Sequence, residues 1–197
     1  YFLRNTFSAL SNSRCEEVIE IAQLTATRKP SSLKPDDVNN LLAAFSKVRL
    51  PAPPTDCLSP IEDLLIKKGL SKAIDSRFVS TVTREPKVTN GNPFQVEVGL
   101  IFGGDLPGDQ PIQVLRFANR VPLMYQQVGC LLTMARESVD WKRYGLDHPG
   151  ARGIPKGPAA VLIHLASTNV QFTSEAKEAL ADNVDVHDEI CLLYTSP

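Results

Sequence analysis

Apolar residues in the first third of the chain recur at helical spacing. A first stripe comprises Cys15, Val18, Ile19 and Ala22. Intervals of three and four residues place such positions on one face of a helix. Ser13 lies three residues before Glu16, which predicts an N-cap at Ser13 with a capping box.

Two further helices are predicted before residue 75. A second stripe comprises Val38, Leu41, Leu42 and Phe45. Pro35 suits the first turn of that helix, although Lys34 is a poor N-cap, and Pro51 is expected to end it. A third helix is predicted from the capping box Ser59–Glu62, and Gly69 is expected to close it as a C′ residue.

The pattern changes after residue 75. Apolar and polar residues alternate over 94–102, which predicts a half-buried strand, and 112–119 reads as a second strand. Pro122 is expected to introduce a helix with an apolar face formed by Met124, Val128, Leu131, Ala135 and Val139. Residues 159–166 predict a buried strand, and a last helix is expected near Ser174. The order predicts an α+β fold.

Composition narrows the class of protein. The chain has 197 residues, of which 43% are apolar and 22% charged, as in ordinary globular domains. The net charge is −1, with +3 over residues 1–90 and −4 over 91–197, so the first half is the better candidate for nucleic-acid contact. No apolar run reaches a membrane-spanning length and no signal peptide is visible, so we expect a cytoplasmic protein without a membrane partner.

Cysteine spacing and the chain ends add two expectations. The four cysteines are far apart and make no metal-ligand pattern with the histidines, which favours buried thiols in a reducing compartment. The chain begins with Tyr1 rather than Met, as a piece of a larger protein would. Residues 191–197 resemble translated adapter sequence, and we expect them to be a non-native tail.

Two lysines are candidates for contacting a phosphate. Lys156 lies in the glycine-rich segment 150–157, but this segment precedes a strand and lacks the Ser or Thr that follows a P-loop lysine. A tight turn is the favoured interpretation there. Lys177 lies near the expected helix start at Ser174, where a cation opposes the helix dipole unless an anion is close. An ordinary exposed lysine is the alternative.

Other polar residues are weaker candidates. Asn119 is interpreted as a turn residue and Arg120 as a possible anion contact. His164, in an apolar strand, is expected to be a core histidine, and Asp36-Asp37 to favour a helix N-terminus rather than acid–base chemistry. The segment 141–144 (Trp-Lys-Arg-Tyr) fits either a stacking surface for nucleic acid or a helix end anchored by Trp141.

Several segments together resemble one family. They are residues 50–61, 93–99, 115–123, 138–145 and 166–169. In this order they resemble the B subunit of archaeal DNA topoisomerase VI, a type IIB topoisomerase, and the resemblance is colinear from about Phe2 to Ile190.

The resemblance implies two domains. Residues 1–75 resemble its helix–two-turns–helix domain, and residues 76–190 its transducer domain of the GHKL ATPases. The transducer implies a mixed sheet with helices on one face and a left-handed β-α-β crossover. A transducer loop lysine contacts the ATP γ-phosphate in this family; Lys177 is matched to it, with Lys156 as runner-up.

The resemblance also implies an activity and partners. The full-length protein binds ATP and Mg, two B subunits close as an ATP gate, and A subunits complete an A2B2 enzyme that passes one DNA duplex through another. The nucleotide motifs of the ATP-binding domain are absent from this sequence, so the chain alone is expected to be inactive and to bind no cofactor. A non-catalytic DNA-binding or scaffold protein related to this family is the alternative.

Overall fold

The computed structural model describes residues 1–7, 10–137, 139, 141–148 and 153–195. Its contacts divide the chain into two compact units, residues 1–53 and residues 54–197, here called the helical unit and the sheet unit. The sequence placed this boundary after residue 75. The structure places it earlier because the helix at 63–73 packs on the sheet.

The helical unit is built from short helices around a small core. Its elements are α1 (Phe2–Thr6), α2 (Asn12–Ile21), the 3-10 turn η1 (Pro30–Ser32) and α3 (Pro35–Lys47). Its buried core consists of Leu3, Leu10, Val18, Ala22, Ala44 and Val48. The predicted stripe of α2 therefore faces the core through Val18 and Ala22. That this unit is a helix–two-turns–helix domain stays a prediction.

The helix ends differ from the sequence prediction in instructive ways. The N-cap of α2 is Ser11, not Ser13, and the Ser11 hydroxyl accepts a hydrogen bond from the Arg14 N–H at 3.3 Å. The poor cap at Lys34 is compensated because the Asp37 carboxylate accepts the Lys34 N–H at 2.8 Å. The helix α3 ends at Lys47, before the proline at 51 is reached.

The sheet unit holds one mixed sheet of six strands. Its elements in chain order are α4 (Asp63–Ala73), β1 (Phe78–Thr83), β2 (Lys87–Thr89), β3 (Asn92–Phe102), β4 (Gln113–Ala118), β5 (Val121–Pro122), α5 (Leu131–Glu137), η2 (Trp141–Tyr144), β6 (Ala159–Ser167) and α6 (Val184–Thr195). The strand order is β1-β3-β6-β4-β5, with β2 also pairing with β3. The pair β4–β6 is parallel and the others are antiparallel.

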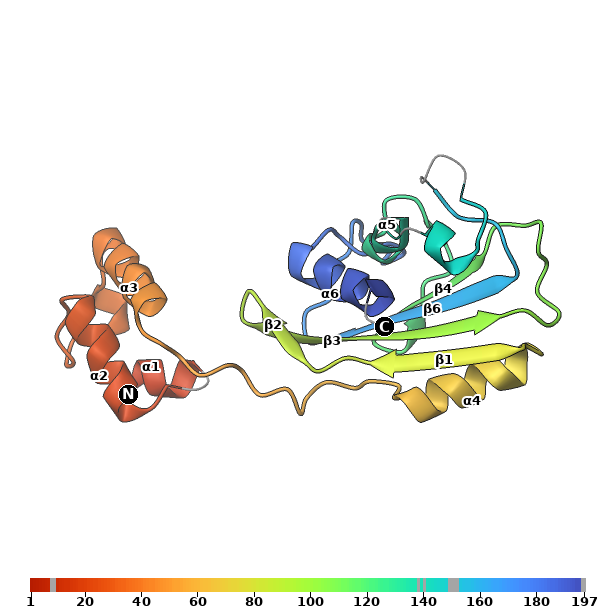
Figure 1. The fold of residues 1–197 in the computed structure, drawn as a ribbon. Helices are drawn as coiled ribbons and strands as arrows, with labels where there is room; N and C mark the ends of the chain where they lie inside the picture. Colours follow the sequence, from red (N-terminus) through yellow and green to blue (C-terminus); the bar gives the residue numbers. More distant parts are fainter. Residues whose placement is uncertain (8–9, 138, 140, 149–152, 196–197) are drawn as a thin grey trace. The chain divides into compact units, whose positions relative to one another are not determined.

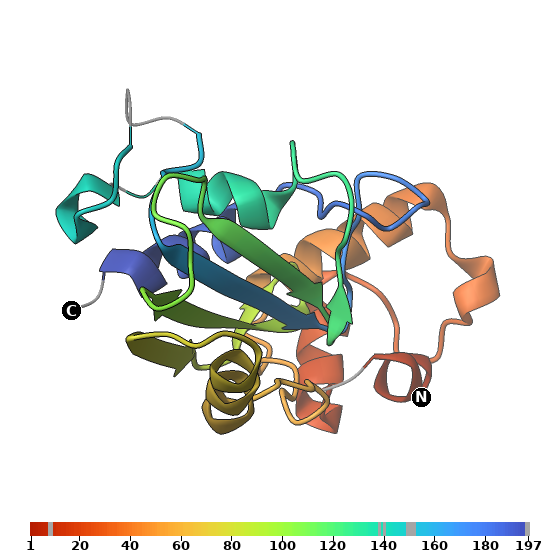
Figure 2. The ribbon, with the colours of Figure 1, turned by 90° about the vertical axis from the view of Figure 1, so that its right-hand side faces the viewer.

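Helices cover both faces of this sheet (Figures 1 and 2). The larger core lies between the sheet and the pair α5 and α6, through Leu132 and Ile190 among others. On the opposite face α4 packs through Ile66 and Leu70. The helices that follow residue 76, α5 and α6, lie on one face, as predicted for the transducer domain; the second face is covered by α4, which the sequence had placed in the helical domain.

Strand β3 is buried on both faces rather than half-buried. It lies between β1 and β6, so the polar positions of its alternating pattern lie under α4 instead of facing solvent. One of them is Gly99, where an added Cβ would lie 2.6 Å from Leu70 Cδ1 and 2.8 Å from Ile66 Cγ2. The glycine allows α4 to approach the sheet closely.

Several boundaries after residue 55 are corrected by the structure. The third helix begins at Asp63 rather than Ser59, and Gly69 lies inside it rather than closing it. Pro122 belongs to β5, and the helix expected there begins at Leu131. The exposed strands β1 and β2 were not predicted, whereas β4 and the fully buried β6 were.

The helix α6 runs through the segment that the sequence predicted to be non-native. It extends from Val184 to Thr195, and the Cys191 thiol lies 3.7 Å from the Ala135 carbonyl oxygen. That residues 191–197 are non-native stays a prediction. No helix in the described ranges is long and apolar enough to cross a membrane.

Two glycine substitutions test the packing of α4. We expect Gly99→Ala to lower the free energy of unfolding by about 1–3 kcal/mol, because the new methyl group overpacks the contact with α4. Urea unfolding followed by circular dichroism measures this change.

The matched control is Gly69→Ala, four residues from α4's C-terminal end and with no atom within 4 Å of an added Cβ. We expect a gain of up to about 1 kcal/mol, because alanine is the better helix former. A loss at Gly69 instead would mean that it is a left-handed helix cap, as the sequence pattern suggested.

Candidate functional site

Lys177 lies at the tip of a closed loop that follows β6. Phe172 and Leu180 form a β-bridge at the base of this loop. The Lys177 N–H donates to the Ser174 carbonyl at 3.2 Å, and its φ of +55° lies in the left-handed region. The side chain is exposed, and its ammonium group has no hydrogen bond or ion pair among the residues that the structure describes.

The expected helix start near this lysine is wrong. The helix α6 begins at Val184, and its cap is Asn183, whose Oδ1 accepts the Val186 N–H at 3.1 Å. Lys177 is therefore in a turn and does not oppose a helix dipole. The helix dipole therefore gives no reason for an anion near Lys177, and only the exposed position of this side chain on its loop favours a phosphate contact.

The loop that carries Lys177 is tied to the start of α5. The Leu131 N–H donates to the Leu180 carbonyl at 3.1 Å, and the Leu180 N–H lies 3.5 Å from the Cys130 sulfur. Leu180 and Cys130 are both fully buried. A displacement of Lys177 would therefore be passed to the buried Leu180, which lies only three residues further along the chain.

Lys156 is held at the opposite end of β6. Its backbone exchanges two hydrogen bonds with Asp147, at 2.7 and 3.1 Å, which leaves only the exposed side chain free to act. The following Gly157 has a φ of +155°, and a Cβ there would lie 2.3 Å from Leu146 Cδ2. This matches the tight turn favoured by the sequence; residues 149–152 lie outside the described part.

The two candidate lysines cannot serve one phosphate. Lys156 precedes β6 and Lys177 follows it, and the nine residues of β6 span about 27 Å at the usual rise of a strand. A lysine side chain reaches only a small part of that distance. A phosphate-sensing role belongs to one end of the sheet or the other.

The Asn119-Arg120 pair forms the tight turn between β4 and β5. Both residues have positive φ, 45° and 66°, as a two-residue hairpin turn requires. The Asn119 amide donates to the Ser167 carbonyl and accepts the Ser167 N–H, each at 2.9 Å. Asn119 is thus confirmed as a turn residue, and it ties the turn to the end of β6.

Arg120 uses part of its guanidinium within the fold. It donates through Nε to the carbonyl oxygen of Ser59 at 3.3 Å and through Nη2 to that of Pro60 at 2.5 Å, in the segment that leads into α4. An anion contact by Arg120 stays a prediction.

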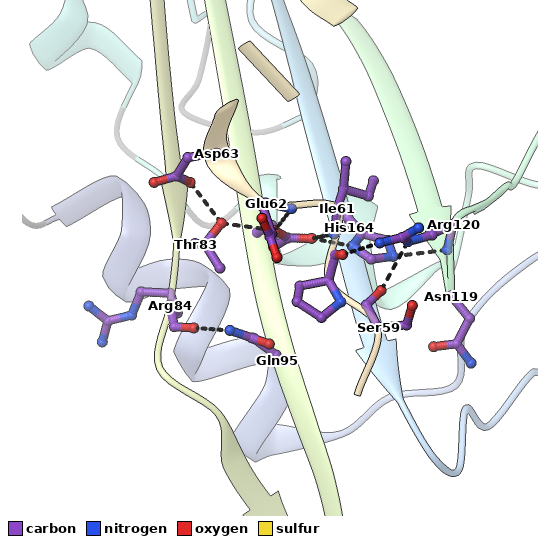
Figure 3. A network of polar contacts seen from close by, with 12 residues as sticks. Ser59, Ile61, Glu62, Asp63, Thr83, Arg84, Gln95, Asn119, Arg120 and His164 are labelled. Carbon is purple, nitrogen blue, oxygen red and sulfur yellow. Dashed lines mark hydrogen bonds and ion pairs between the residues drawn. The ribbon is translucent and has the colours of Figure 1, made fainter. Parts of the chain in front are cut away.

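The buried carboxylate of Glu97 is linked to this turn through His164, which Figure 3 shows next to Arg120. Glu97 Oε2 accepts the Ile61 N–H at 2.6 Å, and Oε1 accepts the Glu62 N–H at 2.7 Å and the Thr83 hydroxyl at 2.8 Å. His164 Nδ1 lies 2.6 Å from Oε2, and both side chains are fully buried. Three segments of the sheet unit thus meet at one acid.

The neighbours fix the protonation of this network. The Arg120 N–H donates to His164 Nε2 at 2.9 Å, so Nε2 is the acceptor and Nδ1 carries the proton given to Glu97. Burial raises the pKa of Glu97, but the hydrogen bonds from His164, Ile61, Thr83 and Glu62 outweigh it and lower the pKa below its ordinary value. Glu97 is an anion with its charge fully hydrogen-bonded.

The sequence predicted the buried position of His164 but not that of Glu97. His164 was interpreted as a satisfied core histidine, and the structure confirms it. Glu97 was placed on a solvent-facing position of a half-buried strand. Its burial could not be seen because its partner His164 is 67 positions away and meets it only in the β3–β6 register.

The remaining candidates have structural roles. Trp141 is buried, which confirms the packing anchor and leaves its ring no free face for a base. Asp37 pairs with Arg28 at 2.6 Å and caps α3, so it is not half of an acid–base pair. In the ranges that the structure describes, no group of three metal-ligating side chains gathers, and the four cysteines are free thiols.

The low pKa of Glu97 predicts acid sensitivity. A carboxylate whose folded pKa is lowered stabilises the fold above its unfolded pKa, and this contribution is lost as the pH falls through the folded value. We expect unfolding to become easier below about pH 4, and Glu97→Gln to reduce this dependence. At pH 7 the same substitution should cost about 3 kcal/mol, because it disturbs a buried ionic network.

Denaturant unfolding at pH 7 and pH 3 checks this prediction. The control is Asp109→Asn, which removes an exposed acid from a loop. Equal acid sensitivity in Glu97→Gln and the unsubstituted chain would show that other groups, such as the ion-paired Glu189, control it.

Comparison with known proteins places the chain in a family. Residues 53–194 match the model of "Topoisomerase VI B subunit, transducer". The chain is 52% identical over 189 residues to the type 2 DNA topoisomerase 6 B subunit of Methanococcoides burtonii, covering 96% of this chain and 30% of that protein. It is 50% identical over 191 residues to the protein of the same name from Methanosarcina barkeri, covering 97% of this chain and 31% of that protein.

The similarity to solved structures is weaker. The B-subunit of the DNA gyrase from Myxococcus xanthus aligns over 66% of this chain and 37% of that chain, with 18% identity and a TM-score of 0.43, which is too low to assign a function. The chain spans about a third of the length of the curated relatives it matches. On the family model and the identity to these relatives, the chain belongs to the topoisomerase VI B subunits.

Proposed function

We propose that the chain is the coupling part of the ATPase subunit of a type IIB DNA topoisomerase. The complete enzyme would relax and decatenate DNA by ATP-dependent passage of one duplex through another. The family match supports the subunit, since the relatives carry the name of a type 2 topoisomerase. The upstream domain of the full subunit would hold ATP and Mg, which this chain alone would not bind.

The observation that carries the proposal is the loop of Lys177. Its ammonium group is exposed and unpaired within the described residues, on a turn closed by the bridge between Phe172 and Leu180. An unpaired cation on a stiff turn is suited to meet an anion outside this chain. Lys156 offers an exposed ammonium too, but at the other end of β6.

The chain's own residues suggest how phosphate contact would be transmitted. ATP supplies a γ-phosphate whose charge is spread over several oxygens, a fit partner for an ammonium group. Lys177 would hold its charge against those oxygens. The loop of Lys177 would then move as one rigid unit toward the phosphate. The Leu180–Leu131 hydrogen bond would carry that displacement to the start of α5.

The helical unit and the partner proteins complete the proposal. We infer that residues 1–53 contribute weak, salt-sensitive DNA contact as a helix–two-turns–helix domain, in line with the positive charge of residues 1–90. The partners would be DNA, the A subunit of topoisomerase VI in an A2B2 assembly, and a second B subunit, in the cytoplasm. A non-catalytic scaffold protein is the alternative, favoured if the ATP-binding motifs of the full subunit are degraded.

Removing the Lys177 ammonium tests the assignment. In the complete enzyme, with both kinds of subunit present, we expect Lys177→Ala to lower ATP turnover by about 100-fold, the usual cost of losing one charge-stabilising group. ATP turnover and DNA relaxation are both measured, because the lysine is proposed to link them.

The matched control is Lys156→Ala, which removes the same charge from the opposite end of β6 and should leave both activities intact. Unchanged turnover in Lys177→Ala together with loss in Lys156→Ala would assign the role to Lys156 instead. If neither substitution matters although the enzyme hydrolyses ATP, the phosphate-sensing lysine lies outside this chain.

The isolated chain should show no ATPase activity. Its sequence lacks the Asp-x-Gly-x-Gly loop and the helix asparagine with which this family holds the nucleotide. A coupled phosphate-release assay on the purified 197-residue protein measures this. Robust ATP turnover that is insensitive to Lys177→Ala would contradict the proposal that another domain of the full subunit binds ATP.

A further inference from the structure

Four hydrogen bonds join the turn between β4 and β5 to the end of β6. The Asn119 N–H donates to the Leu165 carbonyl at 2.9 Å, and the Asn119 side chain exchanges two hydrogen bonds with the Ser167 backbone, each at 2.9 Å. The Arg120 N–H donates to His164 Nε2 at 2.9 Å. Because the turn cannot shift along β6 without breaking these bonds, it moves together with the last residues of that strand.

The same turn holds the chain directly before α4. Residues 59–62 are here called the clamped segment. The Arg120 guanidinium donates to the first two of their carbonyl oxygens, those of Ser59 at 3.3 Å and Pro60 at 2.5 Å. Hydrogen bonds from a charged donor are stronger than those between neutral groups. The side chain of Arg120 therefore ties the clamped segment to the turn whose backbone is fixed on β6.

The buried carboxylate holds the second half of the clamped segment. Glu97 accepts the N–H groups of Ile61 at 2.6 Å and Glu62 at 2.7 Å. It is joined to the turn through His164, which accepts the Arg120 N–H (Figure 3). Glu62 has a φ of +77°, a conformation that persists in a non-glycine residue only where the surroundings hold it. Two linked side chains of opposite charge thus each fix two backbone groups of this segment.

The clamped segment lies on the connection between the two units of the chain. The helical unit ends at residue 53, and residues 54–58 lead from it to the clamped segment. On the other side of the turn, β6 ends at Ser167 and the chain continues into the loop of Lys177. The turn at Asn119 and Arg120 is therefore bonded both to the strand that leads into the Lys177 loop and to the segment through which the helical unit is joined to the sheet.

We propose that Arg120 is a positioning residue that couples the loop of Lys177 to the clamped segment, and through it to the helical unit. This inference rests on the proposed function, which gives Lys177 its phosphate and the helical unit its DNA contact. Hydrogen-bond networks and rigid elements carry coupling between distant sites. A displacement of the end of β6 would move the turn, and the Arg120 guanidinium would move the clamped segment with it. This route differs from the Leu180–Leu131 hydrogen bond, which leads to α5 on the face of the sheet opposite α4.

Hydrogen exchange tests the coupling directly. The amides of Ile61 and Glu62 are followed in the full subunit with and without a non-hydrolysable ATP analogue. We expect the analogue to change their exchange rates at least about fivefold, the lower end of ordinary coupling between sites, and Arg120→Ala to abolish this change. The proposal is overturned if the change persists in Arg120→Ala, or if it is absent from the unsubstituted subunit although the analogue binds.

Enzyme activity tests the consequence. In the complete enzyme, with both kinds of subunit present, we expect Arg120→Ala to lower the number of DNA strand passages per ATP hydrolysed at least about fivefold, while ATP turnover stays within about twofold. Arg120→Lys should restore most of this loss, because an ammonium group can donate to the same two carbonyl oxygens. A phosphate contact or a merely structural role of Arg120 would lower turnover and strand passage together. That result, or no change in either activity, overturns the proposal.

The matched control is Arg77→Ala, which removes an exposed arginine directly before β1. The Arg77 side chain makes no ion pair among the residues that the structure describes. This variant should leave both the exchange response and the strand passages per ATP unchanged. In the 197-residue chain, Arg120→Ala should lower the unfolding temperature by no more than about 8 °C, since two hydrogen bonds of an exposed side chain are lost. If that variant does not fold, Arg120→Gln replaces it with the same expectations.

The outcomes separate this proposal from the proposed function. If the complete enzyme couples Lys177-dependent ATP hydrolysis to DNA relaxation and Arg120→Ala leaves that coupling intact, the positioning role is wrong and the proposed function stands. If the unsubstituted enzyme neither hydrolyses ATP nor relaxes DNA, the proposed function fails and the positioning role falls with it.

Discussion

The sheet unit depends on one buried anion. Glu97 accepts hydrogen bonds from the segment before α4, from β1 and from β6, so a single carboxylate joins three parts of the chain that are distant in sequence. Its four donors compensate for the water that burial removes. Two of these donors are the backbone N–H groups of Ile61 and Glu62, so the same charge also holds the chain directly before the start of α4.

The predictions that held were those in which local pattern and tertiary packing agree. Each of three elements has one favourable environment, and the local sequence pattern predicts it. They are the buried strand β6, the apolar stripe of α2 and the turn at Asn119. The starts of α5 and α6 failed because a proline and a serine were read as helix signals, whereas Pro122 pairs in β5 and Ser174 belongs to a closed loop.

The candidate site shows the same division. Both lysines could be singled out by residue type and by the resemblance, and the predicted strand 159–166 already separates them, but the closed turn that holds Lys177 follows only from the structure. Arg120 and Arg116 look alike in sequence, since each is an arginine near a strand end. Arg120 donates to the segment before α4, whereas Arg116 donates to the loop between β5 and α5. Both roles depend on carbonyl groups whose positions no local sequence pattern predicts.

The order of strands has a consequence for how the chain acquires its structure. The strand β6 lies in the middle of the sheet and pairs with β3 and β4, yet it is the last strand to be synthesised. Until Ser167 has left the ribosome, the edges of β3 and β4 that pair with β6 have no partner strand. Apolar residues that the complete sheet unit buries, such as Val96 and Val98, are then exposed to solvent. Sheets closed by such distant pairings form slowly and expose sticky edges meanwhile. The nascent protein is therefore most vulnerable to aggregation while its central strand is still inside the ribosome.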